Sequence, residues 1–250
     1  MIKLHTHLDL FSGVGGFALA CRWLQINTVA FSETSDFCDR VLARHFPGVP
    51  NLGDVRELNR ATLVKKCDVH PGDVCLVTAG WPCPDFSKLG NKEGLAGDRS
   101  GLWWDCWRVV CDLRPPLVIL ENVPHMLAGD GGAWFGSILG AMARGGYDVE
   151  WGVLSASNFG VRQTRRRVYV VAHDHRRLGV VKGQRPLLPT RTRPHPFGES
   201  QPIPYRVRDT HGITDRVDIS ERVGACANAV VPQIPFEIIG RATERLEWRH

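Results

Sequence analysis

The chain has 250 residues, 43% of them hydrophobic and 23% charged, with a formal net charge of +5. This length and apolar content suffice for one sizeable core with a small appendage. The sequence has no apolar run long enough to span a bilayer, and its start, MIKLHTHLDL, lacks a signal-peptide pattern. The eight cysteines form no C-x-x-C pair and no zinc-like spacing. We therefore expect reduced, mostly buried thiols in a cytoplasmic protein that has no membrane segment and no metal.

The first motif joins a strand to a glycine-rich turn. Residues 4–10 alternate like a strand and run into DLFSGVGGF, after which apolar residues indicate a helix. Strand, turn and helix form the first half of a nucleotide-binding unit. Gly13, Gly15 and Gly16 let the backbone approach a ligand, but the spacing G-x-G-G fits a dinucleotide poorly. On its own, the turn is also compatible with no ligand.

Two acids follow this turn. A second strand, residues 28–32, ends at Glu33, where a carboxylate can accept hydrogen bonds from ribose hydroxyls. Asp54, in LGDVREL, is placed where an acid could meet the exocyclic amine of an adenine. Either acid alone is more often a helix cap or a solvated side chain. The ordered set of loop, acid and acid favours a nucleoside-containing ligand.

A cysteine between two prolines is the most informative feature of the chain. The segment GWPCPDFS, residues 80–87, follows an apolar run at 73–79 that indicates a buried strand. Pro82 and Pro84 hold Cys83 in a rigid, extended loop, because proline fixes φ and disfavours helix in its predecessor. A rigid thiol at a strand end suits a nucleophile. The alternative is a structural cysteine in a proline turn.

Three further clusters follow in chain order. LVILENVP, residues 117–124, is an apolar strand that ends at Glu121. NFGVRQTRRRVYVVAH, residues 158–173, joins a basic loop to a strand. CANAVVPQIPFEIIG, residues 226–240, places Asn228 before an apolar final helix.

Together these motifs resemble those of the carbon-5 DNA cytosine methyltransferases, which use S-adenosylmethionine. DLFSGVGGF resembles the family's cofactor loop, GWPCPDFS its Pro-Cys nucleophile loop, ENVP its Glu-Asn-Val motif, QTRRR its Gln-x-Arg-x-Arg motif and ANAVVP its Gly-Asn-x-Val segment. The stretch DRSGLWWDCWRVVCDLRPPLVILENV also matches in spacing. The match covers about residues 5–173 and 211–240, in family order. Five ordered motifs of this kind are highly specific.

The resemblance implies an α/β, Rossmann-like S-adenosylmethionine-dependent methyltransferase fold: three layers, a mostly parallel sheet and a small irregular recognition region. We expect a catalytic and cofactor-binding domain at residues 1–174 and a reduced target-recognition region at 175–220. We also expect a C-terminal segment at 221–250, whose helix, at about 232–248, packs back onto the catalytic domain. The product would be S-adenosylhomocysteine. The residues implied in cofactor binding are Asp9, Phe11, Ser12, Gly13, Gly15, Gly16, Glu33, Asp54, Val55, Pro82 and Asn228.

The same resemblance implies a covalent mechanism. The Cys83 thiolate would attack carbon 6 of a flipped-out cytosine, and Glu121, with a raised pKa, would protonate ring nitrogen 3. Arg165 and Arg167 would hold the base carbonyl and nearby phosphates. The alternatives without a catalytic role are a salt bridge for Glu121 and a solvated basic edge for the arginines. The residues expected to contact DNA are Ser87, Gln163, Arg191 and Arg193.

Charge is distributed unevenly along the chain. Residues 151–210 hold 12 Lys or Arg and 3 Asp or Glu, a net charge of +9, which leaves −4 for the remainder. One basic segment on a slightly acidic body is typical of a partner with a phosphate backbone, here double-stranded DNA. A solvated linker is the alternative, and six of the 16 prolines lie between 186 and 204. Both interpretations hold if the segment orders on DNA.

The chain departs from the family pattern at three places. Pro84 replaces the usual glutamine, Ala227 replaces a glycine, and the stretch between the last catalytic strand and Asn228 is short. These departures leave two alternatives open: the same catalysis on tRNA, or a catalytically weak nucleic-acid-binding relative. A restriction endonuclease also stays open as a partner, and we expect a monomer.

Overall fold

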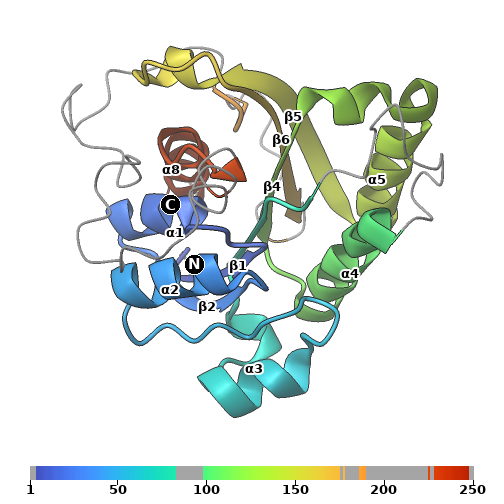
Figure 1. Cartoon of the computed structure of the whole chain (residues 1–250). Coiled ribbons are helices and arrows are strands. Elements are labelled where there is room, and N and C mark those ends of the chain that lie inside the picture. Colours follow the sequence, from blue (N-terminus) through green and yellow to red (C-terminus); the bar gives the residue numbers. More distant parts are fainter. Residues whose placement is uncertain are drawn as a thin grey trace.

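The computed structural model describes residues 4–82, 98–174, 177, 186–189, 225 and 228–247. Its centre is a six-stranded sheet in the order β2-β1-β3-β4-β6-β5 (Figure 1). The strands β2, β1, β3 and β4 pair in parallel, and β6 runs antiparallel to both of its neighbours. The expectation of a mostly parallel sheet is therefore confirmed. The strands are β1 (Thr6–Leu10), β2 (Asn27–Ser32), β3 (Leu76–Ala79), β4 (Leu117–Asn122), β5 (Tyr147–Ser155) and β6 (Arg166–Asp174).

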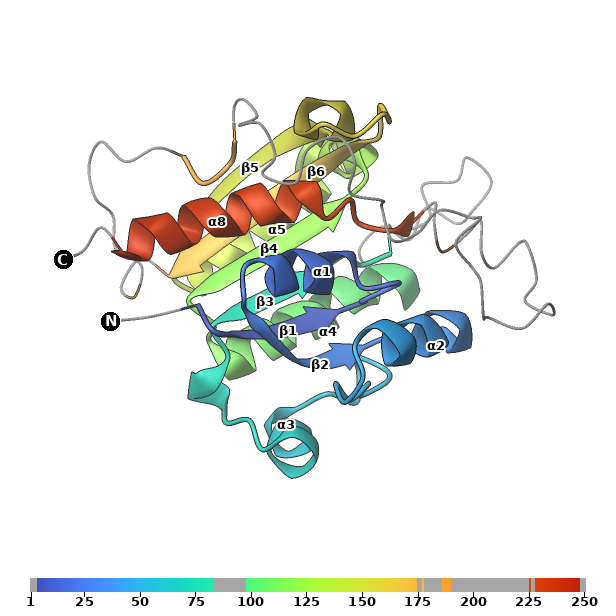
Figure 2. The same ribbon diagram turned by 90° about the vertical axis from the view of Figure 1, so that its left-hand side faces the viewer.

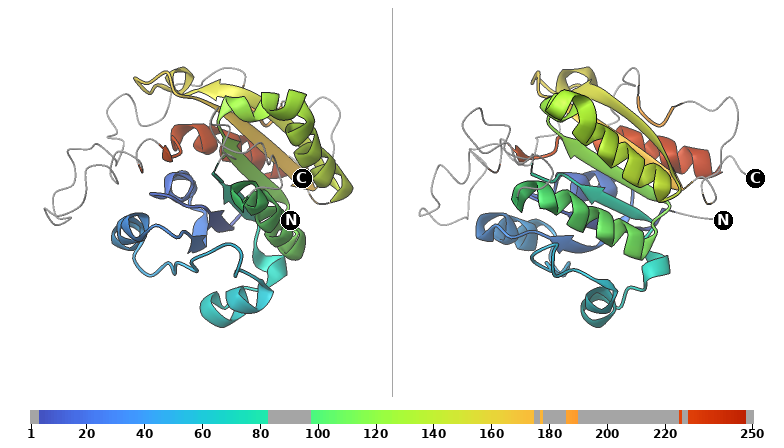
Figure 3. Two further views of the ribbon diagram at one scale, coloured as in Figure 1. Left: turned by 45° about the vertical axis from the view of Figure 1, so that its right-hand side comes forward. Right: turned by 90° about the vertical axis from the view of Figure 1, so that its right-hand side faces the viewer.

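Helices cover both faces of this sheet, which gives the expected three layers (Figures 2 and 3). One face carries α1 (Gly16–Trp23), α2 (Asp36–His45) and α8 (Gln233–Glu247). The other carries α3 (Arg60–Cys67), α4 (Asp98–Leu113) and α5 (Ala133–Arg144). Short 3-10 helices lie in the connections η1 (Pro71–Asp73), η3 (Pro124–Gly132) and η4 (Ala156–Phe159). None of the helices in the described part of the chain has the length and apolar content that a membrane span needs.

The alternation of side chains along β1 builds both layers at once. Leu8 and Leu10 pack in the core that α3, α4 and α5 cover. Successive side chains of a strand point to opposite faces, so His7 and Asp9 lie on the side of α1. Both are fully buried there, although both are polar. A strand with one apolar and one polar buried face is unusual, and the polar face lies under the site described below.

The order of the strands places the functional loops side by side. From β1 the chain goes to β2 on one side and then crosses to β3 on the other. In open α/β sheets the crevice for ligands lies outside the carboxyl ends of strands at such a switch point. The glycine-rich turn after β1 and the segment from Gly80 to Pro82 after β3 therefore open at the same edge.

Element boundaries differ slightly from those expected. The strand expected at 73–79 begins only at Leu76. The residues Pro71–Asp73 form a 3-10 helix, so the first residue of the expected strand belongs to that helix. The final helix, expected at about 232–248, is α8. The division into three segments stays a prediction, since most of residues 175–220 lie outside the described residues.

The last helix lies against the first. Ile234, Ile238 and Ile239 of α8 are buried in one cluster with Phe17 and Ala20 of α1. The segment that leads into α8 also approaches the start of α1, where a Cβ added to Gly16 would lie 2.3 Å from the backbone oxygen of Val230. Gly16 therefore permits a close contact that no larger residue allows.

We predict that Gly16→Ala destabilises the protein by roughly 1–3 kcal/mol, because the new methyl group forces backbone away from backbone. Gly136→Ala is the matched control. It lies in α5, where nothing stands within 4 Å of an added Cβ, so alanine should stabilise the helix by up to about 1 kcal/mol. Urea unfolding of both variants measures the difference. Equal or greater stability of Gly16→Ala than of the wild type would contradict the packing described.

Candidate active site

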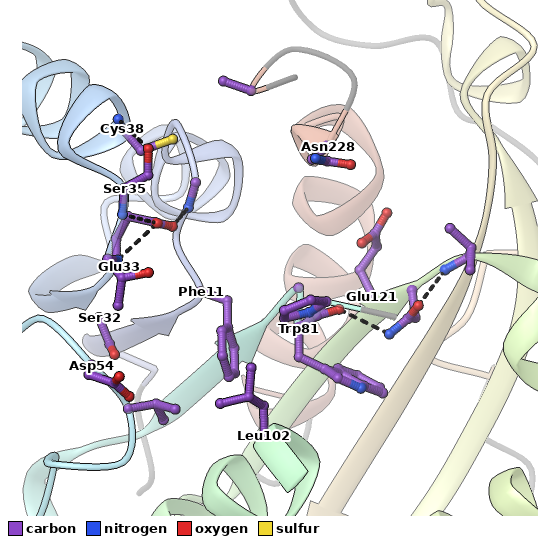
Figure 4. Close-up of a pocket in the computed structure, with 18 of the residues that line it drawn as sticks. Phe11, Ser32, Glu33, Ser35, Cys38, Asp54, Trp81, Leu102, Glu121 and Asn228 are labelled. Atoms are coloured by element: carbon purple, nitrogen blue, oxygen red, sulfur yellow. Dashed lines mark hydrogen bonds between the residues drawn. The ribbon is translucent and has the colours of Figure 1, made fainter. Parts of the chain in front are cut away.

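A pocket of about 790 Å³ opens at the carboxyl-terminal edge of the parallel strands (Figure 4). Its walls come from the residues that follow β1, β2, β3 and β4, together with the loop that enters β6 and with Asn228 ahead of α8. Segments distant in sequence thus converge here because parallel strands end at one edge.

The glycine-rich turn forms one wall and is held by its own backbone. The Ser12 hydroxyl donates to the Asp9 carbonyl oxygen at 2.7 Å, and the Gly15 N–H donates to the Ser12 carbonyl oxygen at 2.8 Å. Gly13 and Gly15 have φ of 53° and 84°, a region that costs glycine nothing. Phe11 adopts φ 52° in spite of its side chain, which is a strained choice. Its ring stands in the pocket wall (Figure 4).

Glu33, directly after β2, holds this turn in place. One carboxylate oxygen accepts the Gly13 N–H at 2.7 Å, and the other accepts the N–H groups of Thr34 and Ser35 at 2.9 and 2.8 Å. Backbone donors thus fix the carboxylate before any ligand binds. The first oxygen keeps room for one more donor, so a ribose hydroxyl can add to it.

Asn51 connects Glu33 to the segment that carries Asp54. Its side-chain oxygen accepts the N–H groups of Glu33 and Gly53 at 3.0 and 3.1 Å. Its amide nitrogen donates to the Glu33 carbonyl oxygen and to Asp39, both at 2.9 Å. The inventory of sequence motifs missed this residue. No local pattern marks it, because its partners lie on separate segments.

Asp54 lies in the pocket wall with its carboxylate already engaged. The Arg56 guanidinium contacts both of its oxygens, at 2.5 to 3.0 Å, and holds the pKa of the carboxyl below its usual value. Arg108 of α4 donates to the carbonyl oxygens of Val55 and Arg56 and so fixes the turn. An amine that reaches Asp54 would therefore share it with Arg56.

Glu121, at the end of β4, is the acid best placed for proton transfer. It is 6% exposed, and the Arg167 Nε lies 3.1 Å from one of its oxygens. Burial raises the pKa of Glu121 to about 7, although the guanidinium groups of Arg167 and Arg165 pull it down. A carboxyl with this pKa exists in both protonation states at neutral pH, as a general acid requires.

Asn122 ties β4 to the segment in which the nucleophile is expected. Its amide nitrogen donates to the Trp81 carbonyl oxygen at 3.1 Å, and its oxygen accepts the Val123 N–H at 2.8 Å. Trp81 stands two residues before Cys83, which itself lies outside the described residues. The buried Trp81 ring packs against Trp103 of α4, with ring centroids 5.4 Å apart.

Most of the residues implied by the motifs come together in this pocket. Those in its walls are Phe11, Gly13, Glu33, Asp54, Val55, Pro82, Glu121, Arg165, Arg167 and Asn228. Asp9, Ser12, Gly15 and Gly16 are not among the residues that line the pocket. Gln163 is exposed in the loop before β6, outside the pocket lining. Cys83, Ser87, Arg191 and Arg193 lie outside the described residues.

The pocket is also lined by residues to which the motifs assigned no role, among them Ser32, Thr34, Ser35, Cys38, Arg56, Trp81 and Leu102. Several of them directly follow β2 or β3, so proximity to a strand end was the available signal. Among the described residues, no group of three or more His, Cys, Asp or Glu is arranged to hold a metal ion.

A family model for C-5 cytosine-specific DNA methylases matches residues 5–223. The chain belongs to this family. The type II methyltransferase M.BsuFI of Bacillus subtilis is 34% identical over 179 residues, 72% of this chain and 41% of that protein. M.HhaI of Haemophilus parahaemolyticus is 30% identical over 164 residues, 66% of this chain and 47% of that protein. The chain thus spans less than half the length of these relatives.

Solved structures agree on the fold. A putative DNA modification methyltransferase encoded in an Escherichia coli prophage superposes with a TM-score of 0.58 at 24% identity, over 69% of this chain and 47% of that one. The Dnmt2 methyltransferase of S. pombe superposes with a TM-score of 0.55 at 20% identity, over 72% of this chain and 53% of that one. These structures share with this chain the S-adenosylmethionine-dependent methyltransferase fold.

The raised pKa of Glu121 has a consequence for stability. Between its ordinary pKa of 4.5 and about 7, the folded protein keeps a proton that the unfolded chain has released. Stability must therefore fall as pH rises through this window. The side chain of Glu121→Gln cannot ionise. We predict that its free energy of unfolding rises, relative to that of the wild type, by up to about 3 kcal/mol between pH 4.5 and pH 8.

Urea unfolding at several pH values measures this difference, and Asp148→Asn, which alters an exposed carboxyl on β5, is the matched control. The control should follow the wild-type pH dependence. Parallel pH curves for Glu121→Gln and the wild type would show that Glu121 is not buried with a raised pKa.

Proposed function

We propose that this chain methylates carbon 5 of cytosine in DNA, with S-adenosylmethionine as the methyl donor and Cys83 as the covalent nucleophile. The observation that carries the proposal is one pocket that joins a glycine turn fixed by Glu33 to a buried Glu121 with a pKa of about 7. Membership of the methylase family supplies the reaction class.

The pocket fits the cofactor in its chemistry. Gly13 and Gly53 leave open space where a side chain would otherwise stand, since nothing lies within 4 Å of an added Cβ at either. Glu33 keeps acceptor capacity for a ribose hydroxyl, and Asp54 offers a carboxylate at the far end of the same wall. The volume lies within the range of about 300–1,000 Å³ that is typical of small-molecule sites. When bound, S-adenosylmethionine supplies a methyl group activated by a sulfonium.

Cytosine chemistry assigns the remaining tasks. Carbon 5 is a poor nucleophile until the Cys83 thiolate adds to carbon 6 and turns the ring into an enamine. Negative charge then builds on the ring, and the Glu121 carboxyl relieves it by protonating nitrogen 3. After methyl transfer to carbon 5, a base removes the proton there. The carbon–sulfur bond then breaks, Cys83 leaves as the thiolate, and nitrogen 3 returns its proton to the Glu121 carboxylate.

Arg165 and Arg167 serve this reaction from the other side of Glu121. Both lie in the pocket wall, and both lower the pKa of Glu121 from the value that burial alone would set. In the proposed complex they donate to the base carbonyl and to nearby phosphates. Because the target base is stacked inside a duplex, it must be flipped out to reach this pocket.

The DNA partner is supported by charge. Residues 151–210 carry a net charge of +9, which suits a phosphate backbone. Gln163 lies in the exposed loop before β6, and Arg191 and Arg193 are proposed contacts outside the described residues. A compact recognition region, action in the cytoplasm of a bacterial cell and a restriction endonuclease as counterpart all belong to the proposal.

We predict that duplex DNA containing 5-fluorocytosine traps a covalent complex through Cys83. Fluorine cannot leave as a cation, so the final elimination stops. A random-sequence duplex is the probe, with cofactor present, and a denaturing gel detects a shifted band. Cys83→Ala should give no shift, whereas Cys111→Ala, which removes an exposed thiol on α4, should shift as the wild type does.

Two further probes sharpen this test. The same duplex without fluorine should give methyl transfer and no trapped band. A tRNA substrate measured in parallel should give no transfer, and transfer to tRNA alone would replace the proposed substrate. A shift that persists in Cys83→Ala would show that the nucleophile has been wrongly assigned.

A further inference from the structure

Four buried polar side chains form a continuous chain across three strands of the sheet. Thr28 of β2 lies 2.9 Å from the His7 Nδ1, and the His7 Nε2 lies 2.7 Å from the Thr78 hydroxyl of β3. The Thr78 hydroxyl in turn donates to the Asp9 carboxyl at 2.6 Å. All four side chains are at most 7% exposed. The chain ends at Asp9, two residues before the pocket wall begins at Phe11.

The direction of these hydrogen bonds follows if the Asp9 Oδ1 is the acceptor. Thr78 then gives its one proton to this oxygen, and its own oxygen accepts from the His7 Nε2. His7 is then the tautomer with the proton on Nε2, and its Nδ1 accepts from the Thr28 hydroxyl. Every donor points towards Asp9. Such a chain polarises itself, so each bond strengthens the next.

Asp9 passes this constraint to the loop. Its backbone oxygen accepts the Ser12 hydroxyl, and the turn continues to Gly13, whose N–H is held by Glu33. The carboxyl also interacts with the backbone N–H of Ala18, in the first turn of α1. The orientation of the Asp9 carboxyl therefore bears on both the loop and the helix that follows it.

The charges around Asp9 tie it to the pocket as well. Burial is the main reason that its pKa is raised to about 8, and the Glu33 carboxylate at the end of β2 raises it further. The other ionisable groups packed against it are Cys21 of α1, whose pKa is raised partly by Asp9, and His7 through Thr78. His7 stays neutral, because full burial lowers its pKa to about 3.

We propose that His7 is a positioning residue for the cofactor, acting through Thr78 and Asp9 on the loop from Phe11 to Gly16. The inference rests on the proposed function, in which this loop receives S-adenosylmethionine. Buried polar groups can often be replaced by apolar ones of similar shape without loss of stability. We therefore infer that these four hydrogen-bonded side chains set the geometry of the loop rather than the stability of the core.

The test compares three variants of the chain with a matched control. His7→Phe removes both ring nitrogens, Thr78→Val removes the link and keeps its shape, and Thr78→Ser keeps the hydroxyl. His173→Phe is the control, since His173 is a buried histidine on β6, paired with Leu117 at the start of β4 and so at the end of that strand away from the pocket. Thermal unfolding establishes that each variant is folded at the temperature of the assay.

Calorimetric titration with S-adenosylmethionine gives the first readout. His7→Phe and Thr78→Val should bind about tenfold or more weakly, because a buried acceptor loses its donor. In steady state both should raise KM for the cofactor more than they lower kcat. Thr78→Ser should restore binding, and His173→Phe should bind as the wild type does. Folded His7→Phe and Thr78→Val variants with wild-type affinity would overturn the proposal.

Nitrogen-15 NMR of the histidine rings gives a readout that needs no cofactor. The His7 signal is the one that disappears in His7→Phe. It should report a neutral ring with the proton on Nε2 from pH 5 to pH 8. Thr78→Val should change its chemical shift. The amide signals of Gly13 and Gly15 should move in His7→Phe and stay in His173→Phe. A charged ring at pH 5, the opposite tautomer, or unmoved glycine signals would overturn the proposal.

The two arms separate this inference from the proposed function. Failure of the wild type to bind S-adenosylmethionine contradicts the proposed function, and with it the cofactor as the object of positioning. The glycine signals still decide whether His7 acts on the loop. Wild-type binding together with unmoved glycine signals contradicts the role of His7 alone.

Discussion

The site depends on how three acids are accommodated at one edge of a parallel sheet. Asp9, Glu33 and Glu121 stand at or just past the carboxyl ends of β1, β2 and β4, and a buried carboxylate without partners is costly. Each is compensated differently: backbone N–H groups surround Glu33, a threonine hydroxyl reaches Asp9, and Arg167 faces Glu121. Backbone donors fix Glu33 as an acceptor, while burial leaves Glu121 ready to exchange a proton.

The sequence predicted those parts of the molecule whose signal is local. The strands β1, β2 and β4 show in short apolar runs. The glycine turn and Glu33 directly follow β1 and β2, and Glu121 is the last residue but one of β4. The register between strands carries no such signal. His7 meets Thr28 and Thr78 only because β1 pairs with both β2 and β3, across 21 and 71 residues of chain. Asn51 likewise meets partners on separate segments, which no local pattern predicts. The ion pair of Arg56 with Asp54 depends on the turn between them, which the sequence did not predict either.

Closure of the molecule by its last helix completes the pocket. The segment before α8 passes over the first turn of α1 at Gly16, and this contact carries Asn228 to the pocket wall. The first and last described segments of the chain are therefore neighbours at the site. In the described part of the chain, the walls of the pocket come from this edge of the sheet, from Leu102 of α4 and from this return.

The most direct measurement of the central claim is calorimetric binding of S-adenosylmethionine to Glu33→Gln. The substitution keeps the shape of the side chain but replaces one of the two acceptor oxygens by a donor. We expect one site per chain in the wild type, affinity at least about tenfold weaker in Glu33→Gln, and no change in Asp148→Asn, an acid at the far edge strand β5. Equal affinities in all three proteins would contradict the claim that the cofactor is held at this edge of the sheet.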